Sequence, residues 1–145
     1  TRTCGDVLGC MIDDVVRVLL DDQTLVVATV MKKIERLGEV DDPHVVKVVF
    51  DKHYFALYFS RHSIPFVRDK GSADIVHYKH IGLYGYTKDF LFTYKTLGES
   101  DLERLEKLEQ LRILENGYRI KLVETKYETF GVDTPDDLEK VRHYL

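Results

Sequence analysis

The stretch from Thr24 to Met31 (TLVVATVM) constrains the fold more than any other part of the chain. It is rich in β-branched residues and almost continuously apolar, which is typical of a strand buried on both faces. The preceding residues Met11–Leu20 (MIDDVVRVLL) repeat their apolar side chains at helical spacing. A buried strand next to an amphipathic helix indicates an α/β domain in which helices pack on a sheet.

Further strands and helices alternate along the rest of the chain. Alternating or apolar runs predict strands at 45–50, 54–60, 79–86 and 118–125. Asp51-Lys52-His53 separates the first two of these strands, a spacing that fits a hairpin. We predict a single domain over residues 1–145, with an irregular lead-in at 1–10 and a mixed sheet flanked by helices.

Two helices are predicted between the last two strands. The first covers 88–97, and the second opens at the capping-box sequence beginning with Ser100 and ends before Gly117. This second helix is predicted to be the longest of the chain. Its expected buried stripe is Leu102, Leu105, Leu108, Leu111, Ile113 and Leu114.

The composition argues against several classes of function. Hydrophobic residues at 44% and charged residues at 32% describe an ordinary soluble protein, and the net charge of −4 gives no reason to expect nucleic acid. No apolar run approaches the roughly 20 residues of a membrane span, and no signal peptide is visible. Cys4 and Cys10 have neither a second pair nor nearby histidines, so we expect reduced thiols in a cytoplasmic protein.

Three places along the chain carry polar side chains where chemistry is possible. Arg61 follows a strand and precedes a long loop, and its guanidinium suits a carboxylate or a phosphate. His80 and Tyr84 fall on one face of the strand 79–86. Gly82 and Gly85 thin that strand, and glycine in a strand often permits close approach by a ligand or another backbone. Glu109 and Gln110 interrupt the leucine-rich helix.

Asp133 lies between a predicted strand and a predicted helix. The strand 118–125 precedes it, and Thr134-Pro135-Asp136-Asp137 supplies an N-cap, a first-turn proline and acidic residues for a following helix. Open α/β sheets place ligands at such ends. With Mg²⁺, Asp133 could help to hold a nucleotide phosphate.

Each of these features also has a structural interpretation. Arg61 can be a solvated charge at a strand end, and His80 a structural histidine. Glu109 and Gln110 can belong to the solvated face of their helix, and Asp133 can cap the next one. Taken alone, none of them identifies a function. The sequence also lacks the common phosphate-binding glycine motifs, the zinc motif HExxH and the serine-hydrolase motif GxSxG.

Several blocks, read in order, resemble one known family. These are VVKVVFD at 45–51, ALYFSR at 56–61 with Ile64-Pro65, KHIGLYGY at 79–86, LEQLR at 108–112, ENG at 115–117 and GVDTPDDL at 131–138. The chain is similar from about Met11 to its end to the 3-deoxy-manno-octulosonate (Kdo) cytidylyltransferases. These enzymes are the CMP-Kdo synthetases of lipopolysaccharide assembly.

The resemblance implies a glycosyltransferase-A-like nucleotidyltransferase fold and a magnesium-dependent transferase reaction between CTP and Kdo, giving CMP-Kdo and pyrophosphate. It also implies a cytoplasmic homodimer, with the 64–73 loop as part of the dimer contact. Asp133 would be a catalytic metal ligand. Arg61, His80, Tyr84, Glu109 and Gln110 would line the sugar-acid pocket, with Arg61 facing the sugar carboxylate.

The N-terminal part of the chain departs from the family pattern. The family's nucleotide-binding half, with its basic triphosphate-binding stretch, precedes the equivalent of Met11 and has no counterpart here. Only Asp6, in Gly5-Asp6, is a candidate for the second metal carboxylate. We therefore expect an incomplete fold, the C-terminal sugar-binding portion. Its exposed sheet edge should lie beside Thr24–Met31 and should favour aggregation or dimerisation.

Two other functions remain open from the sequence. The chain can belong to a nucleotidyltransferase for a different acidic sugar, because family analogy does not fix the stereochemistry of a sugar. It can also be a non-catalytic remnant that binds a sugar acid or a partner, because residues that would hold a triphosphate are missing.

Overall fold

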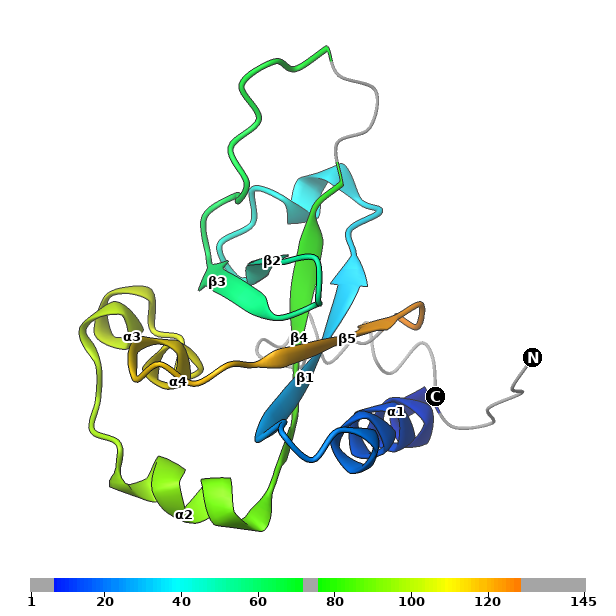
Figure 1. The fold of residues 1–145 in the computed structure, drawn as a ribbon. Coiled ribbons are helices and arrows are strands. Elements are labelled where there is room, and N and C mark those ends of the chain that lie inside the picture. The colour runs from blue at the N-terminus through cyan, green and yellow to red at the C-terminus, as the bar shows by residue number, and fades with distance from the viewer. Residues whose placement is uncertain (1–6, 72–75, 129–145) are drawn as a thin grey trace, which may run out of the picture.

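Five strands form one mixed sheet in the structure, a computed structural model that describes residues 7–71 and 76–128 (Figure 1). The strand order is β3-β2-β4-β1-β5. The strands are β1 (Val27–Lys33), β2 (Lys47–Phe50), β3 (Ala56–Ser60), β4 (Tyr78–Tyr86) and β5 (Lys121–Thr125). β1 is parallel to β5, whereas the β1–β4, β2–β3 and β2–β4 pairs are antiparallel. The predicted mixed sheet and the predicted hairpin are both confirmed.

The strand predicted to be buried on both faces lies inside the sheet. Every residue of β1 from Val27 to Lys32 is buried, and β4 and β5 pair with its two sides. The expectation of an exposed edge beside Thr24–Met31 is therefore wrong. An inner strand, β4, has an open stretch instead, because β2 pairs only with its first two residues, Tyr78 and Lys79. In the described part of the chain no strand pairs with residues 81–86 on that side.

Helix α1 (Val7–Asp21) covers one face of the sheet and begins four residues before the predicted start at Met11. Its Met11 and Val15 pack against Ala28 and Val30 of β1, which alternate to that face. Gly85 of β4 lets the helix approach closely, because a Cβ there would lie 2.6 Å from Val15 Cγ1. Cys10, on this helix, is disulfide-bonded, so the expectation of a reduced thiol is wrong for this residue.

The other face is covered by α3 (Asp101–Glu106) and α4 (Leu111–Glu115), and α2 (Lys88–Thr96) follows β4 at the end of the sheet. Figure 1 shows α1 and the α3–α4 pair on opposite sides of β1 and β4. The larger core cluster lies on the α3–α4 side and includes the fully buried Phe59, Leu111, Ile113 and Ile120. The predicted helix over 88–97 is confirmed as α2.

The predicted longest helix is wrong, because the chain breaks it into α3 and α4. Lys107 ends α3 in the left-handed conformation, with φ 56° and ψ 44°. Arg61, at the end of β3, binds the carbonyl oxygens of Glu106 and Lys107 at 2.8 and 3.2 Å. It thereby replaces the helical partners that the carbonyls at this helix end lack. Ser100 begins α3 as predicted and donates its backbone N–H to Glu103. Leu102 and Leu105 are 37% and 80% exposed, so they do not form the expected buried stripe.

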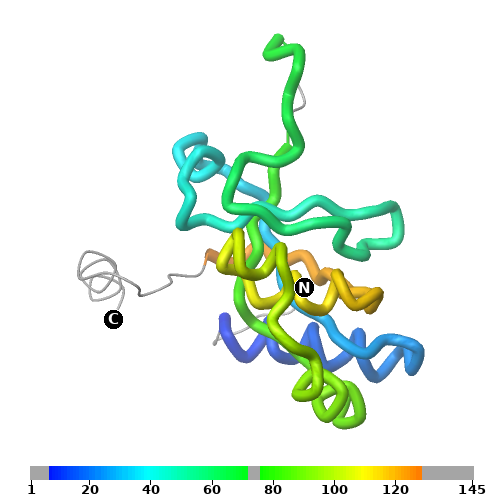
Figure 2. The backbone as a smooth tube through the Cα atoms, turned by 90° about the vertical axis from the view of Figure 1, so that its left-hand side faces the viewer, coloured from blue at the N-terminus to red at the C-terminus, as the bar shows by residue number. Residues whose placement is uncertain are grey.

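Two connections lie at the far end of the sheet from α2. One contains the 3-10 helix η1 (Leu37–Glu39) between β1 and β2. The other begins after β3, and Figures 1 and 2 both show residues 61–71 projecting away from the sheet. None of the helices in the described ranges combines the length and the apolar character that crossing a membrane requires.

Candidate functional site

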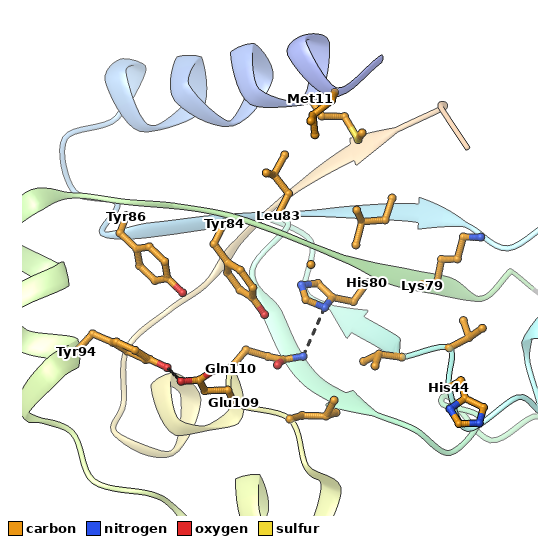
Figure 3. A pocket seen from close by; sticks show the side chains of 16 residues that line it. Met11, His44, Lys79, His80, Leu83, Tyr84, Tyr86, Tyr94, Glu109 and Gln110 are labelled. Atoms are coloured by element: carbon orange, nitrogen blue, oxygen red, sulfur yellow. Dashed lines mark hydrogen bonds between the residues drawn. The ribbon is translucent and has the colours of Figure 1, made fainter. Parts of the chain in front are cut away.

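A pocket of about 680 Å³ lies beside the open stretch of β4, between that strand and the turn that joins α3 to α4 (Figure 3). β4 supplies His80, Gly82 and Tyr84 to it, and the α3–α4 turn supplies Glu109 and Gln110. No atom would lie within 4 Å of a Cβ added at Gly82. This glycine therefore keeps the pocket side of the strand open, whereas Gly85 serves the packing of α1.

His80 is held by hydrogen bonds at both ring nitrogens. Its Nε2 lies 2.9 Å from Thr29 Oγ1 on β1, and its Nδ1 lies 3.5 Å from the amide nitrogen of Gln110. The ring also packs edge-on against Phe59, with 4.9 Å between centroids. Burial disfavours the charged ring and lowers the pKa of His80 from 6.5 to about 4. The ring is therefore neutral near pH 7 and contributes hydrogen bonds rather than charge.

Tyrosines continue the pocket wall along β4 and onto α2. The Tyr84 ring lies beside the His80 ring and stacks on the Tyr86 ring, with 5.4 and 5.7 Å between the ring centroids. The Tyr86 and Tyr94 rings are also neighbours, with 5.8 Å between their centroids. Burial raises the pKa of Tyr84 and of Tyr94 well above the usual phenol value. Both hydroxyl groups therefore stay protonated at neutral pH and can donate hydrogen bonds.

Glu109 and Gln110 reach the pocket because the helix breaks just before them. The Oε1 atom of Glu109 accepts a hydrogen bond of 2.6 Å from the Tyr94 hydroxyl, and Gln110 is only 6% exposed. The interpretation of Gln110 as part of a solvated helix face is therefore wrong. The structure brings together four of the predicted pocket residues, His80, Tyr84, Glu109 and Gln110.

Arg61 is not among the residues that line this pocket. Its guanidinium donates to three backbone carbonyl oxygens, those of Pro43, Glu106 and Lys107, at 2.8 to 3.2 Å. It lines a separate, smaller cavity together with Pro43 and His62. In the structure Arg61 therefore ties β3 to the end of α3 and to the 42–45 turn, and its role toward a sugar carboxylate stays a prediction.

The cation at the rim of the large pocket is Lys79, which is largely buried. Its ammonium lies 2.7 Å from Glu39 and 3.5 Å from Glu128. Glu128 also lies 3.1 Å from Lys32, which is 3% exposed. These carboxylates balance the charges of the two lysines. Beside His80, the pocket is lined by the neutral side chains of Tyr84 and Gln110 and by the carboxylate of Glu109.

The predicted metal ligands Asp133 and Asp6 lie outside the described residues. Over residues 7–71 and 76–128, no three His, Cys, Asp or Glu side chains come together in a way that could hold a metal ion. The assignment of both aspartates to Mg²⁺ stays a prediction.

Sequence reasoning missed three residues of the site, Thr29, Tyr86 and Tyr94. Thr29 carries a hydroxyl group within an apolar, fully buried strand. A buried hydroxyl needs a hydrogen-bond partner, which indicates a polar group on a neighbouring strand. Tyr86 follows Tyr84 by two residues and so shares its strand face. Tyr94 left no comparable signal, because its place depends on how α2 packs.

Comparison with known proteins gives a consistent assignment. The cytidylyltransferase family model matches residues 10–122. The 3-deoxy-manno-octulosonate cytidylyltransferase of Solibacter usitatus is 55% identical over 130 residues, which are 90% of this chain and 51% of that protein. The protein of the same name from Geotalea uraniireducens is 49% identical over 144 residues, covering 93% of this chain and 57% of that protein.

A solved structure agrees with these relatives. It is that of a CMP:2-keto-3-deoxy-manno-octonic acid synthetase complexed with CTP, and it matches with a TM-score of 0.85 and 40% identity. The match covers 92% of this chain and 54% of that one. The nucleotidyltransferase fold implied by the resemblance is thereby confirmed, and the chain spans about half the length of the relatives that it matches.

Proposed function

This chain belongs to the cytidylyltransferase family, and we propose that it forms the sugar-acid-binding part of a Kdo cytidylyltransferase. In the reaction, the anomeric hydroxyl oxygen of Kdo attacks the α-phosphorus of CTP. A new P–O bond forms, the bond to the β-phosphate oxygen breaks, and the products are CMP-Kdo, pyrophosphate and the proton of the hydroxyl. This activity serves the synthesis of lipopolysaccharide.

The observation that carries the proposal is the convergence of His80, Tyr84, Glu109 and Gln110 on one pocket. A neutral imidazole, protonated phenols, an amide and a carboxylate offer donors and acceptors in a fixed arrangement. A ligand rich in hydroxyl groups matches such a set, because each buried polar group needs a partner. Holding the sugar in one pose would orient its anomeric oxygen for attack on the phosphate.

Mg²⁺ is part of the proposal as the ion that would neutralise the triphosphate. Magnesium ions commonly bind one or two carboxylates together with phosphate oxygens. Asp133 is the proposed ligand and Asp6 a second candidate. Sugar binding and orientation are the steps that we assign to residues 7–71 and 76–128, and neither step requires the ion.

The proposal extends to a cytoplasmic homodimer. The projecting segment 61–71 supports a contact between subunits, because its Phe66 is 82% exposed. Analytical ultracentrifugation of the chain tests this contact, with Phe66→Ser as the variant and Leu37→Ser, at another highly exposed apolar residue, as the control. A dimer lost only in the Phe66 variant supports it, and a dimer unaffected by that variant argues against it.

Calorimetric titration of Kdo into the purified chain, without CTP, tests the proposed pocket. We expect Kdo to bind, and Gln110→Leu and His80→Phe to weaken the binding about tenfold or more, because each removes a hydrogen bond inside a buried site. Glu99→Gln, at an exposed position outside the pocket, is the control. Equal affinity of the wild type and both pocket variants would show that Kdo binds elsewhere.

Turnover is a separate measurement. Incubation with Mg²⁺, CTP and Kdo, followed by detection of pyrophosphate, reports whether the chain alone completes the reaction. We expect sugar binding without turnover, because the family's triphosphate-binding stretch has no counterpart in this sequence. A panel of 2-keto sugar acids, titrated in the same way, would reveal a different acidic sugar if one binds more tightly than Kdo.

A further inference from the structure

One buried polar side chain next to the pocket has no role in the proposal above. Thr29 lies in the middle of β1, is fully buried and pairs in register with Tyr84 of β4. The pairing between β1 and β4 shifts directly after Thr29, so that Val30 faces Ile81. This bulge brings two carbonyl oxygens of β4 near the Thr29 hydroxyl, that of Leu83 at 2.8 Å and that of Ile81 at 3.3 Å.

The neighbours of this hydroxyl determine where its proton points. If the single proton of Thr29 pointed to His80 Nε2, the hydroxyl oxygen and the Leu83 carbonyl oxygen would face each other at 2.8 Å with no proton between them, so the proton points to Leu83. The third neighbour, His80 Nε2 at 2.9 Å, must then donate to Thr29 Oγ1. The ring of His80 therefore carries its proton on Nε2. Since the ring is neutral in its buried position, Nδ1 keeps a free lone pair.

That lone pair in turn orients the amide of Gln110. The amide nitrogen, which can donate, lies 3.5 Å from Nδ1 (Figure 3). The reversed amide would place two acceptors against each other, which is unfavourable. The Gln110 carbonyl oxygen is therefore turned away from the ring. Among the described residues no group donates to it, so it is available to accept a hydrogen bond from a ligand.

We propose that Thr29 is a positioning residue, which sets the tautomer of His80 and through it presents the Gln110 carbonyl oxygen as an acceptor for a sugar hydroxyl. The inference rests on the proposed function for the identity of the ligand. It makes the pocket selective for a hydroxyl group at the position of this oxygen. An analogue with a hydrogen or a fluorine in place of that hydroxyl would leave the oxygen unpaired and would bind more weakly.

The first test measures the ring itself, in the chain without ligand. Two-bond ¹H–¹⁵N spectra distinguish the protonated from the bare nitrogen of a histidine. We expect the Nε2–H form for His80 in the wild type and in Thr29→Ser, which keeps the hydroxyl. Thr29→Val has almost the same shape but cannot accept the proton, so we expect the Nδ1–H form to appear. An Nδ1–H ring in the wild type would overturn the proposal, even if Thr29→Val fails to fold.

A second variant tests the direction of the effect. Gln110→Leu should leave the His80 ring in the Nε2–H form, because Thr29 sets it, while Kdo affinity falls about tenfold. In the same titration, Thr29→Val should weaken Kdo binding by a similar factor, and Thr29→Ser should bind within about twofold of the wild type. A ring that changes tautomer in Gln110→Leu, or stays unchanged in Thr29→Val, would contradict the assigned role.

These measurements separate the two proposals. If the ring responds to Thr29→Val as expected but the wild type does not bind Kdo, the positioning role stands and the proposed ligand is wrong. If Kdo binds and the ring does not respond, the proposed function stands and the role of Thr29 is overturned.

Discussion

His80 shows how burial decides the chemistry of one residue. The ring packs between Phe59 and Tyr84 and bonds to Thr29, in surroundings that disfavour a charge. Histidine is often considered a proton carrier near neutral pH, but here its pKa is too low for that role. Its contribution at the site is therefore a fixed pair of hydrogen bonds.

The low pKa of His80 predicts that the free energy of unfolding decreases as the pH falls. Between the unfolded pKa of 6.5 and the folded pKa of about 4, the unfolded chain binds a proton that the folded chain does not. Stability is therefore greatest above the unfolded value and is lost on acidification. We expect a loss of about 2 kcal/mol between about pH 7.5 and about pH 5.

Urea unfolding at a series of pH values measures this dependence. His80→Gln is the matched variant, because glutamine offers similar hydrogen bonds without titrating in this range. Glu103 and Glu128, whose pKa values are lowered by their cationic partners, lose their contribution at still lower pH and leave the chosen window largely to His80. If the wild type and His80→Gln lose the same stability from about pH 7.5 to about pH 5, the prediction fails.

At the scale of elements, one ion pair joins the two short helices that carry the site. Glu103 of α3 accepts two hydrogen bonds from the Arg112 guanidinium of α4, at 2.8 and 2.6 Å, and both side chains are mostly buried. Glu103 also accepts from the Ser100 backbone in the capping box. The pair therefore fixes the angle of the turn that holds Glu109 and Gln110.

We expect Glu103→Gln to lower the free energy of unfolding by about 2 kcal/mol, because it removes a charge from a two-pronged, mostly buried ion pair. Asp101→Asn is the matched control, since it alters an exposed pair with Arg104 and should cost less than about 0.5 kcal/mol. Thermal or urea unfolding of both variants decides. Equal losses would mean that the pair does not brace the turn.

The two glycines of β4 predict different effects of an alanine substitution on the free energy of unfolding. Gly85→Ala should destabilise the chain by about 1–3 kcal/mol, because the new methyl group would press against Val15 and Leu19 of α1. Gly82→Ala meets no atom within 4 Å and should be close to neutral. Urea unfolding compares the two variants. A Gly85→Ala chain as stable as the Gly82→Ala chain would mean that α1 shifts freely on the sheet.

At the scale of the whole molecule, the sheet has an unpaired edge beside its pocket. Residues 81–86 of β4 have no strand on one side within the described ranges. Leu8 and Met11 of α1 also line the pocket there. The chain spans about half the length of its relatives. Unpaired backbone groups next to apolar side chains favour pairing with another strand.

We expect the chain to associate beyond the proposed dimer as its concentration rises, through pairing at the β4 edge. Gly82→Lys should weaken the association, because a charge at an edge disfavours strand addition. Gly38→Lys makes the same change of charge on η1, away from this edge, and should have no effect. Sedimentation velocity at increasing concentrations measures both. A wild-type chain that does not grow beyond the dimer throughout the range would show that the edge is protected.

The sequence by itself determined the local elements of this protein. The continuous β-branched run became the buried strand β1, the apolar spacing before it became α1, and the capping box began α3 where predicted. These features depend on neighbours in the chain, so periodicity and helix-end chemistry are sufficient to find them. The resemblance, carried by short blocks, likewise placed His80, Tyr84, Glu109 and Gln110 in one pocket.

Only the tertiary structure decided which parts of the chain meet across long sequence distances. The break at Lys107 follows a helical pattern in the sequence, and it accompanies the capture of the α3 carbonyls by Arg61 from β3. The same capture keeps Arg61 out of the large pocket. The open stretch beside the pocket fell on β4 rather than on β1, because strand order depends on pairing between distant segments. Thr29 contacts His80 because the distant strands β1 and β4 pair. The sequence indicates that a hydroxyl in an apolar run needs a hydrogen-bond partner, but it does not identify that partner.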